Sequence, residues 1–401
     1  MTTTHLARKR FKVLFAGICS MLLTVGIARF SYTPMLPIMQ AQAGLGVAEG
    51  GWLAAINYVG YLLGALIAAK VSSLHVKDRL YRIGLIVAII TTFMMGVSDN
   101  FWVLALSRFF AGICAVGGML LGAALILNWL LRHDMRSELG IHFSGLGLGI
   151  AMVALFVEIA SRHLNWSQQW FGMTLLGVLL LIPAWRWLPP PSNSGHSQQG
   201  RVLTDRPPQK GFLAIFMLSY FCAGIGYVVS ATFIVALIDQ LPGLQGKGTW
   251  AFLLLGVCAA PATMLWDLFA RRWGPYNAMI LAFLVQSIAA LLPVWSPSLG
   301  MALASAALFG MTFTGIVSLV LTLSGLYYPT KPAKMMGNMT MCYGVAQIFA
   351  PAITGILAER AGNYHAGMYM AAGGLFVGAL LAVYLRRQPD AKKVSDVLVE
   401  S

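Results

Sequence analysis

The stretch Gly26-Ile27-Ala28-Arg29-Phe30-Ser31-Tyr32-Thr33-Pro34-Met35-Leu36-Pro37 lies in an apolar run from Phe11 to about Met39 that carries one charge deep inside it, Arg29. A helix rises about 1.5 Å per residue, so this run can cross a bilayer and would place Arg29 within roughly one turn of the midplane. A guanidinium at that depth is costly unless it faces protein or water, and such residues often mark a substrate or ion path. We predict that Arg29 faces a binding site; the alternative is a structural arginine bound to backbone carbonyls.

Composition places the whole chain in a membrane. Of the 401 residues 58% are hydrophobic and 10% are charged, whereas about 25% are charged in soluble proteins. The five cysteines fall in apolar runs with neither metal-ligand spacing nor a disulfide framework. We therefore predict an all-α membrane protein. The sequence shows no Ser/His/Asp set, so we also predict that the protein is not an enzyme and uses no cofactor or metal.

The apolar segments are long enough to form transmembrane helices. Each one is about 20 residues or longer, which is the length that a spanning helix needs. We count twelve such segments: 11–39, 48–69, 80–98, 101–131, 137–160, 168–188, 211–239, 249–270, 275–294, 299–327, 335–358 and 364–385.

The basic residues indicate how the chain is oriented. With the N-terminus inside, 22 of the 27 Lys and Arg fall on the cytoplasmic side, three fall in outer loops, and Arg29 and Arg108 lie within the membrane. Cytoplasmic loops of membrane proteins carry such an excess. We therefore predict a bacterial inner-membrane protein with both termini in the cytoplasm. The net charge of +14 then needs no nucleic-acid partner.

The chain divides into two halves that resemble each other. The polar stretch 189–210 contains Pro189-Pro190-Pro191 and predicts a cytoplasmic linker. It would separate a six-helix bundle at 1–188 from a second one at 211–387, followed by a tail at 388–401. A shift of 198 residues aligns the halves without a gap, for example Gly112 with Gly310. This register indicates a duplicated six-helix unit.

The duplication also shows where the halves differ. Arg29 aligns with Tyr227, and Arg108 aligns with Ala306. A requirement of the scaffold would have kept a charge in both halves. The asymmetry therefore favours a role for the two arginines in binding or coupling.

Several motifs resemble those of the major facilitator superfamily. Arg108 and Gly112 match its Arg-x-x-x-Gly signature, and Gly145, Gly147 and Gly149 resemble its antiporter glycine motif. The stretch from Gly26 to Pro37 is similar to the YbfB/YjiJ-type bacterial branch. The loop after the second segment should carry Gly-x-x-x-Asp-Arg-x-Gly-Arg-Arg, but residues 68–82 keep only scattered basic residues. After the eighth segment Asp267 is present, but Arg271 stands at the usual aspartate position.

The resemblance implies two pseudo-symmetric bundles around a central cavity lined by segments 1, 4, 7 and 10. Arg29 and Arg108 would both face this cavity and could share one bound anion. Gly112, Gly145, Gly147, Gly149, Asp267 and Arg271 would serve conformational change. Arg108 could instead extend toward the membrane interface.

Groups that could bind cargo or carry a proton are few. Guanidinium does not titrate at physiological pH, so coupling would need another group. Glu158 ranks first among the candidates, which are Glu158, Asp239, Asp267 and His142. Glu158 could simply pair with Arg162 one turn later. Tyr32, Tyr58 and Tyr227 complete the predicted binding or coupling set.

We predict a monomeric secondary transporter of a small organic molecule that works by alternating access, coupled to protons and running as an exporter. One alternative is an organic-anion uniporter or exchanger that uses Arg29 and Arg108 as its anion site. A membrane receptor that binds without transporting is the alternative from another class.

Overall fold

The computed structural model of the chain describes residues 3–192, 204–239, 248–296, 298–361 and 365–400. These residues form helices without any strand, because a chain inside a bilayer has to satisfy its backbone hydrogen bonds within each segment. Several helix starts are fixed by a side chain that accepts a backbone N–H: Ser73, Asn100, Asn165 and Ser298.

The first half contains eight helices and two π-helical segments. In chain order these are α1 (Thr3–Met21), η1 (Leu22–Phe30), α2 (Tyr32–Ala43), α3 (Val47–Lys70), α4 (Leu74–Val97), α5 (Phe101–Val116), η2 (Gly117–Gly122), α6 (Ala123–Arg132), α7 (Leu139–Ala160) and α8 (Trp166–Arg186). The first predicted segment is therefore α1, η1 and α2 in succession, and the fourth is α5, η2 and α6.

The second half follows the same plan, and within the described residues no π-helical segment interrupts its helices. They are α9 (Lys210–Asp239), α10 (Gly248–Trp273), α11 (Pro275–Trp295), α12 (Leu299–Tyr327), α13 (Pro332–Ala361) and α14 (His365–Arg386), followed by α15 (Pro389–Glu400). Within the described residues eleven spans are long and apolar enough to cross a membrane. The remaining predicted segment, 335–358, lies in α13, a helix of 30 residues. The predicted all-α membrane fold is confirmed.

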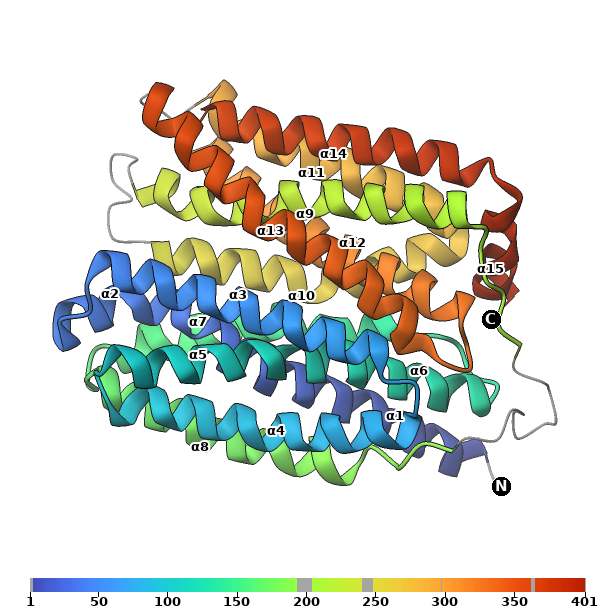
Figure 1. Cartoon of the computed structure of the whole chain (residues 1–401), viewed down its shortest axis with the longest axis horizontal. Helices are drawn as coiled ribbons and strands as arrows, with labels where there is room; N and C mark the ends of the chain where they lie inside the picture. Colours follow the sequence, from blue (N-terminus) through green and yellow to red (C-terminus); the bar gives the residue numbers. More distant parts are fainter. Residues whose placement is uncertain (1–2, 193–203, 240–247, 297, 362–364, 401) are drawn as a thin grey trace.

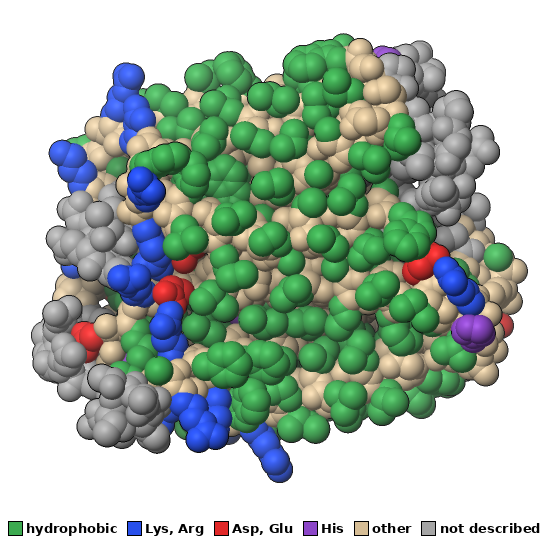
Figure 2. All heavy atoms as spheres, turned by 180° about the vertical axis from the view of Figure 1, so that it is seen from behind, with side chains coloured by type: hydrophobic (Ala, Val, Ile, Leu, Met, Phe, Trp, Pro, Cys, Tyr) green, Lys and Arg blue, Asp and Glu red, His purple; other side chains and the backbone are tan. Residues whose placement is uncertain are grey.

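The two halves lie side by side, with α1 to α8 in the lower part of Figure 1 and α9 to α14 in the upper part. They meet where α7 packs on α10 and where α3 packs on α13. Both ends of the chain lie at one end of the molecule (Figure 1). Figure 2 shows apolar side chains over the lateral face and most Lys and Arg side chains gathered at one end, as expected for a membrane protein with a charge bias.

Contacts inside one half recur 198 residues later in the other. Ser107 donates a hydrogen bond to the Thr91 carbonyl (2.7 Å), and Ser305 donates one to the Ala289 carbonyl (2.6 Å). A Cβ added to Gly112 would lie 2.1 Å from the Asn57 carbonyl oxygen, and one added to Gly310 would lie 2.4 Å from that of Leu255. These pairs keep the predicted register and support the duplication.

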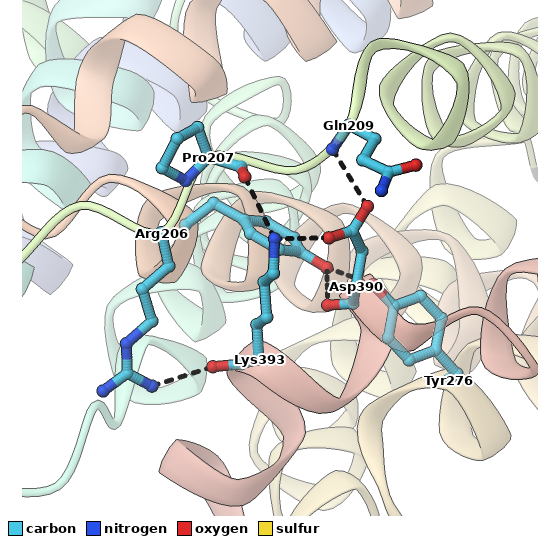
Figure 3. A network of polar contacts seen from close by, with 7 residues as sticks. Arg206, Pro207, Gln209, Tyr276, Asp390 and Lys393 are labelled. Carbon is cyan, nitrogen blue, oxygen red and sulfur yellow. Dashed lines mark hydrogen bonds and ion pairs between the residues drawn. The ribbon is translucent and has the colours of Figure 1, made fainter.

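The end of the linker is bound to the second half by a polar network (Figure 3). Asp390 on α15 accepts the Gln209 backbone N–H (2.9 Å) and pairs with Lys393. Arg206 donates to the Lys393 carbonyl, and the Tyr327 hydroxyl donates to the Asp390 carbonyl. Within the predicted linker, residues 193–203 lie outside the described residues.

Candidate functional site

Arg29 is buried on a widened helical turn, in the π-helical segment η1. The Ser31 N–H donates to the Gly26 carbonyl five residues earlier (3.1 Å), the π-helical pattern that often accompanies functional sites. Gly26 packs directly on Gly149 of α7, since a Cβ on either glycine would lie 2.8 Å from the other's Cα. The side chain of Arg29 lines a cavity to which both halves contribute, and 8% of the residue is exposed.

Tyrosine rings surround the Arg29 guanidinium. Its Cζ lies 4.3 Å from the ring centroid of Tyr61 and 5.2 Å from that of Tyr58, both on α3. Cations are attracted to aromatic faces at these distances. Tyr227 of the second half lines the same cavity as the guanidinium. Within the described residues no carboxylate forms an ion pair with Arg29.

Arg29 lines a small cavity of about 30 Å³, a volume that has room for about one or two water molecules. Both halves contribute to its wall, and among the described residues of that wall Arg29 alone carries a formal charge. The lining residues are Val25, Arg29, Phe30, Tyr61, Met119, Leu146, Tyr227, Phe313, Val317, Tyr343 and Gln347.

The wall contributed by the second half is aromatic. Tyr227 contacts Phe313 and Tyr343, with ring centroids 5.3 and 5.7 Å apart, and Tyr343 stacks on Tyr220 at 4.6 Å. Beside this wall the Gln347 amide oxygen is buried and has no hydrogen-bond partner among the described residues. The cavity thus combines one cation, a polar amide and flat apolar surfaces, a combination typical of small-molecule sites.

Arg108 lies next to Arg29 but is directed at the backbone. Its guanidinium donates to the carbonyl oxygens of Ala28 (3.0 Å) and Arg29 (3.3 Å). Its Cζ lies 4.5 Å from the ring centroid of Tyr32, and the Tyr32 hydroxyl in turn donates to the Gly50 carbonyl (2.8 Å). Arg108 and Tyr32 therefore contact the turn that carries Arg29 and are absent from the cavity lining.

Two of the predicted titratable groups lie away from the cavity. Glu158, on the last turns of α7, is 3.6 Å from the Arg162 guanidinium. His142 is fully buried inside the first half, against Gly17 and Gly122. Neither lines the cavity, so the structure brings together Arg29, Tyr58 and Tyr227 from the predicted set and places Glu158 and His142 elsewhere.

The predicted motif glycines are contact points between helices. Added Cβ atoms show that Gly145 and Gly149 face α1 and η1, whereas Gly147 faces α10, where its Cβ would lie 2.3 Å from the Ala260 nitrogen. Gly112 faces α3. α7 is therefore in backbone contact with its own half on one side and with the opposite half on the other.

Asp267 and Arg271 lie at the end of α10 and pair at 3.3 Å. Beside them, Thr263 donates across the halves to the Gly140 carbonyl (2.7 Å), and Gly337 of α13 contacts the backbone of Ala69 on α3. At this end, which also carries the chain termini, the halves are tightly closed.

Sequence reasoning did not identify Phe313 as a cavity residue. A signal was present, because Phe309 and Phe313 are one turn apart on a helix expected to line the cavity, and their rings stack at 5.1 Å.

The chain is similar to known membrane transporters in sequence and in fold. Residues 21–383 match the family model described as "Uncharacterised MFS-type transporter YbfB". The uncharacterized MFS-type transporter YceJ of Bacillus subtilis (strain 168) is 24% identical over 374 residues, which cover 91% of this chain and 87% of YceJ.

Two further similarities are more distant. A probable sugar efflux transporter of Helicobacter pylori (strain HPAG1) is 24% identical over 249 residues, covering 61% of this chain and 59% of the relative. The crystal structure of the human organic anion transporter MFSD10 (TETRAN) superposes with a TM-score of 0.71 at 18% identity, covering 94% of this chain and 99% of MFSD10.

Proposed function

The chain belongs to the YbfB-type group of the major facilitator superfamily, and from that premise we propose that it carries small organic anions across the membrane. Its relatives are transporters and not enzymes, so it is a multi-pass membrane transporter of small solutes. The anionic cargo, the direction and the coupling are the proposed parts.

The observation that carries the proposal is the position of Arg29. A buried charge needs a partner, because its desolvation costs several kcal/mol. Tyrosine rings compensate Arg29 in part, but among the described residues that line the cavity there is no acidic side chain. A carboxylate or sulfonate of the cargo would supply the missing charge through two parallel hydrogen bonds from the guanidinium.

The opposite wall favours an anion with an apolar or aromatic body. Tyr227, Phe313 and Tyr343 form a continuous aromatic surface facing the guanidinium, and offset or tilted ring pairs at such spacings add about 0.5–1.5 kcal/mol each. Gln347 could hydrogen-bond a polar substituent. MFSD10, which shares this fold, is an organic anion transporter, and this agrees with the proposed class of cargo.

The closed cavity requires the halves to separate for cargo to enter or leave. About 30 Å³ cannot hold an organic anion, so the site has to expand by movement of one half against the other, as in alternating access. The glycine contacts between α7 and α10 form a smooth surface on which such movement can occur.

For direction we propose export. The name of the Helicobacter relative describes efflux, and a monoanion leaving a cell that is negative inside gains about 2.3 kcal/mol per 100 mV. The membrane potential alone could therefore drive the cycle. Proton-coupled export is the second candidate, and it would need Glu158 or His142, neither of which lines the cavity.

The decisive experiment compares Arg29 variants in binding and in transport. Purified protein would be screened by thermal shift with benzoate, cyclohexanecarboxylate and acetate, and transport of labelled benzenesulfonate would be followed in proteoliposomes. We expect benzoate to stabilise the protein most, cyclohexanecarboxylate less and acetate least. Arg29→Lys should weaken binding about 10- to 100-fold through loss of a charged hydrogen bond, and Arg29→Gln should abolish it.

Arg186→Gln, which alters an exposed arginine at the end of α8, is the matched control and should behave as wild type. A potential imposed without a pH gradient should drive transport of the anion, whereas a requirement for the pH gradient would support proton coupling. Equal anion binding by wild type and Arg29→Gln would refute the proposal.

A further inference from the structure

A second and larger pocket lies on the outer surface of the second half, outside the central cavity. It is a groove of about 430 Å³ between α10, α11 and α12. Its lining is apolar apart from one guanidinium and consists of Ala262, Leu265, Trp266, Leu268, Phe269, Arg272, Trp273, Leu281 and Met311.

Contacts between α10 and α12 give the groove its shape. The Trp266 indole N–H donates to the Met311 carbonyl on α12 (2.7 Å). Gly315 makes room for this ring, because a Cβ there would lie 2.0 Å from the indole Cδ1. The side chains of Leu268, Leu281 and Met311 are 63%, 39% and 40% exposed on the face that contacts lipid. In a bilayer such a groove is filled by an acyl chain.

One end of the groove is cationic. Arg272 belongs to the last turn of α10 and lines the groove. Two residues later Gly274, with φ of +89°, is the N-cap of α11, and no side chain caps this N-terminus. Arg386 of α14 donates to Asn277 of α11 (2.7 Å), so a second guanidinium reaches the same turn. Uncapped helix N-termini and guanidinium groups both favour phosphate.

We propose that this groove binds an anionic phospholipid, with an acyl chain along α10 to α12 and the headgroup phosphate at Arg272 and the start of α11. Aromatic residues at the polar end, Phe269 and Trp273, are typical of the membrane interface. Basic pockets between transmembrane helices are suited to anionic headgroups. The site would act on α10, the helix that contacts α7 across the halves at Gly147 and Gly256.

Native mass spectrometry of the purified full-length protein tests the proposal. The protein would be titrated with phosphatidylglycerol and with phosphatidylcholine that carry the same chains. We expect tighter binding of phosphatidylglycerol. Arg272→Gln should weaken that lipid about fivefold, the effect of about 1 kcal/mol for one cation near the surface, and should leave phosphatidylcholine unchanged.

Two further variants separate the headgroup from the chain. Leu281→Trp, which fills the groove, should weaken both lipids, and Arg186→Gln, on the first half, should change neither. Glycerol phosphate at millimolar concentration should not compete, because it lacks the chain. The proposal is overturned if phosphatidylglycerol shows no preference, if the preference survives Arg272→Gln, or if glycerol phosphate displaces the lipid.

Discussion

Replacing Arg108 with leucine should destabilise the protein through the backbone of the first span. The Arg108 guanidinium satisfies the carbonyl oxygens of Ala28 and Arg29. The hydrogen bond from Ser31 to Gly26 spans five residues, the one from Met35 to Ser31 spans four, and between these two registers residue 34 is a proline without an N–H. Arg108 supplies hydrogen-bond donors at this junction.

The magnitude follows from two opposing effects. Two carbonyl oxygens lose charged hydrogen bonds worth about 1.5–3 kcal/mol each. Removing a guanidinium that is 3% exposed returns part of its desolvation cost. We expect a net loss of about 2–4 kcal/mol in the free energy of unfolding. Pro34→Ala supplies an N–H, so the loss caused by Arg108→Leu should shrink by at least about 1 kcal/mol in that background.

The assay is a double-mutant cycle of unfolding in detergent, combined with transport in proteoliposomes. The two variants should be coupled in stability, and Pro34→Ala should bind anions as wild type does. If Arg108→Leu unfolds like wild type but loses anion binding, Arg108 contacts cargo and the structural role is wrong. Additive effects of the two variants would equally refute the role of Pro34.

Three other variants test other parts of the structure. Gly147→Leu should abolish transport while the protein still folds, because even a Cβ at this position would lie 2.3 Å from the Ala260 nitrogen of the opposite half. Gly84→Ala is the control and should transport normally, because its Cβ would lie 3.9 Å from the nearest neighbour. Asp390→Asn should lower the unfolding temperature at pH 7. Burial alone would raise the pKa of the Asp390 carboxyl, but the Lys393 ammonium and the Gln209 N–H hold this pKa below its ordinary value. In thermal scans at several pH values, the higher unfolding temperature of the wild type should therefore persist down to about pH 4 and be lost below it. Glu158→Gln should change stability by less than about 0.5 kcal/mol, because its partner Arg162 is 69% exposed, and loss of a pH-dependent transport signal in that variant would instead identify Glu158 as a proton site.

The architecture could be predicted from the sequence because the bilayer imposes it. Apolar runs of spanning length, the polar linker and the basic bias at one side depend only on composition along the chain. The buried position of Arg29 was predictable for the same reason, since its depth follows from helix rise. The 198-residue register was visible because both halves keep the same close contacts, as at Gly112 and Gly310.

The direction of side chains was not predictable. In an α-helix each residue turns the chain by about 100°, and a π-helical turn adds a residue, so everything after η1 and η2 is rotated relative to a regular helix. No residue type marks this change. It affects Arg29, which lies inside η1 and faces the cavity. Arg108 lies at a similar depth on the regular helix α5, before η2, and its guanidinium binds the backbone of η1. The polar network around Asp390 joins segments about 180 residues apart, which sequence patterns alone do not pair.

The halves differ at the aligned positions of Arg29 and Arg108, and the structure gives a physical reason for this difference. Arg108 binds the carbonyl of Arg29 itself, so the first half uses one arginine to shape the turn that presents the other. The second half presents Tyr227 at the duplicated position of Arg29. A ligand can shift a conformational equilibrium only by its differential affinity for the two states. An anion held by Arg29 on one side and by an aromatic surface on the other gains both contacts only when the halves are together. Such a cargo would favour the closed state that each transport cycle has to pass through, and an anion too small to reach both walls should bind without promoting it.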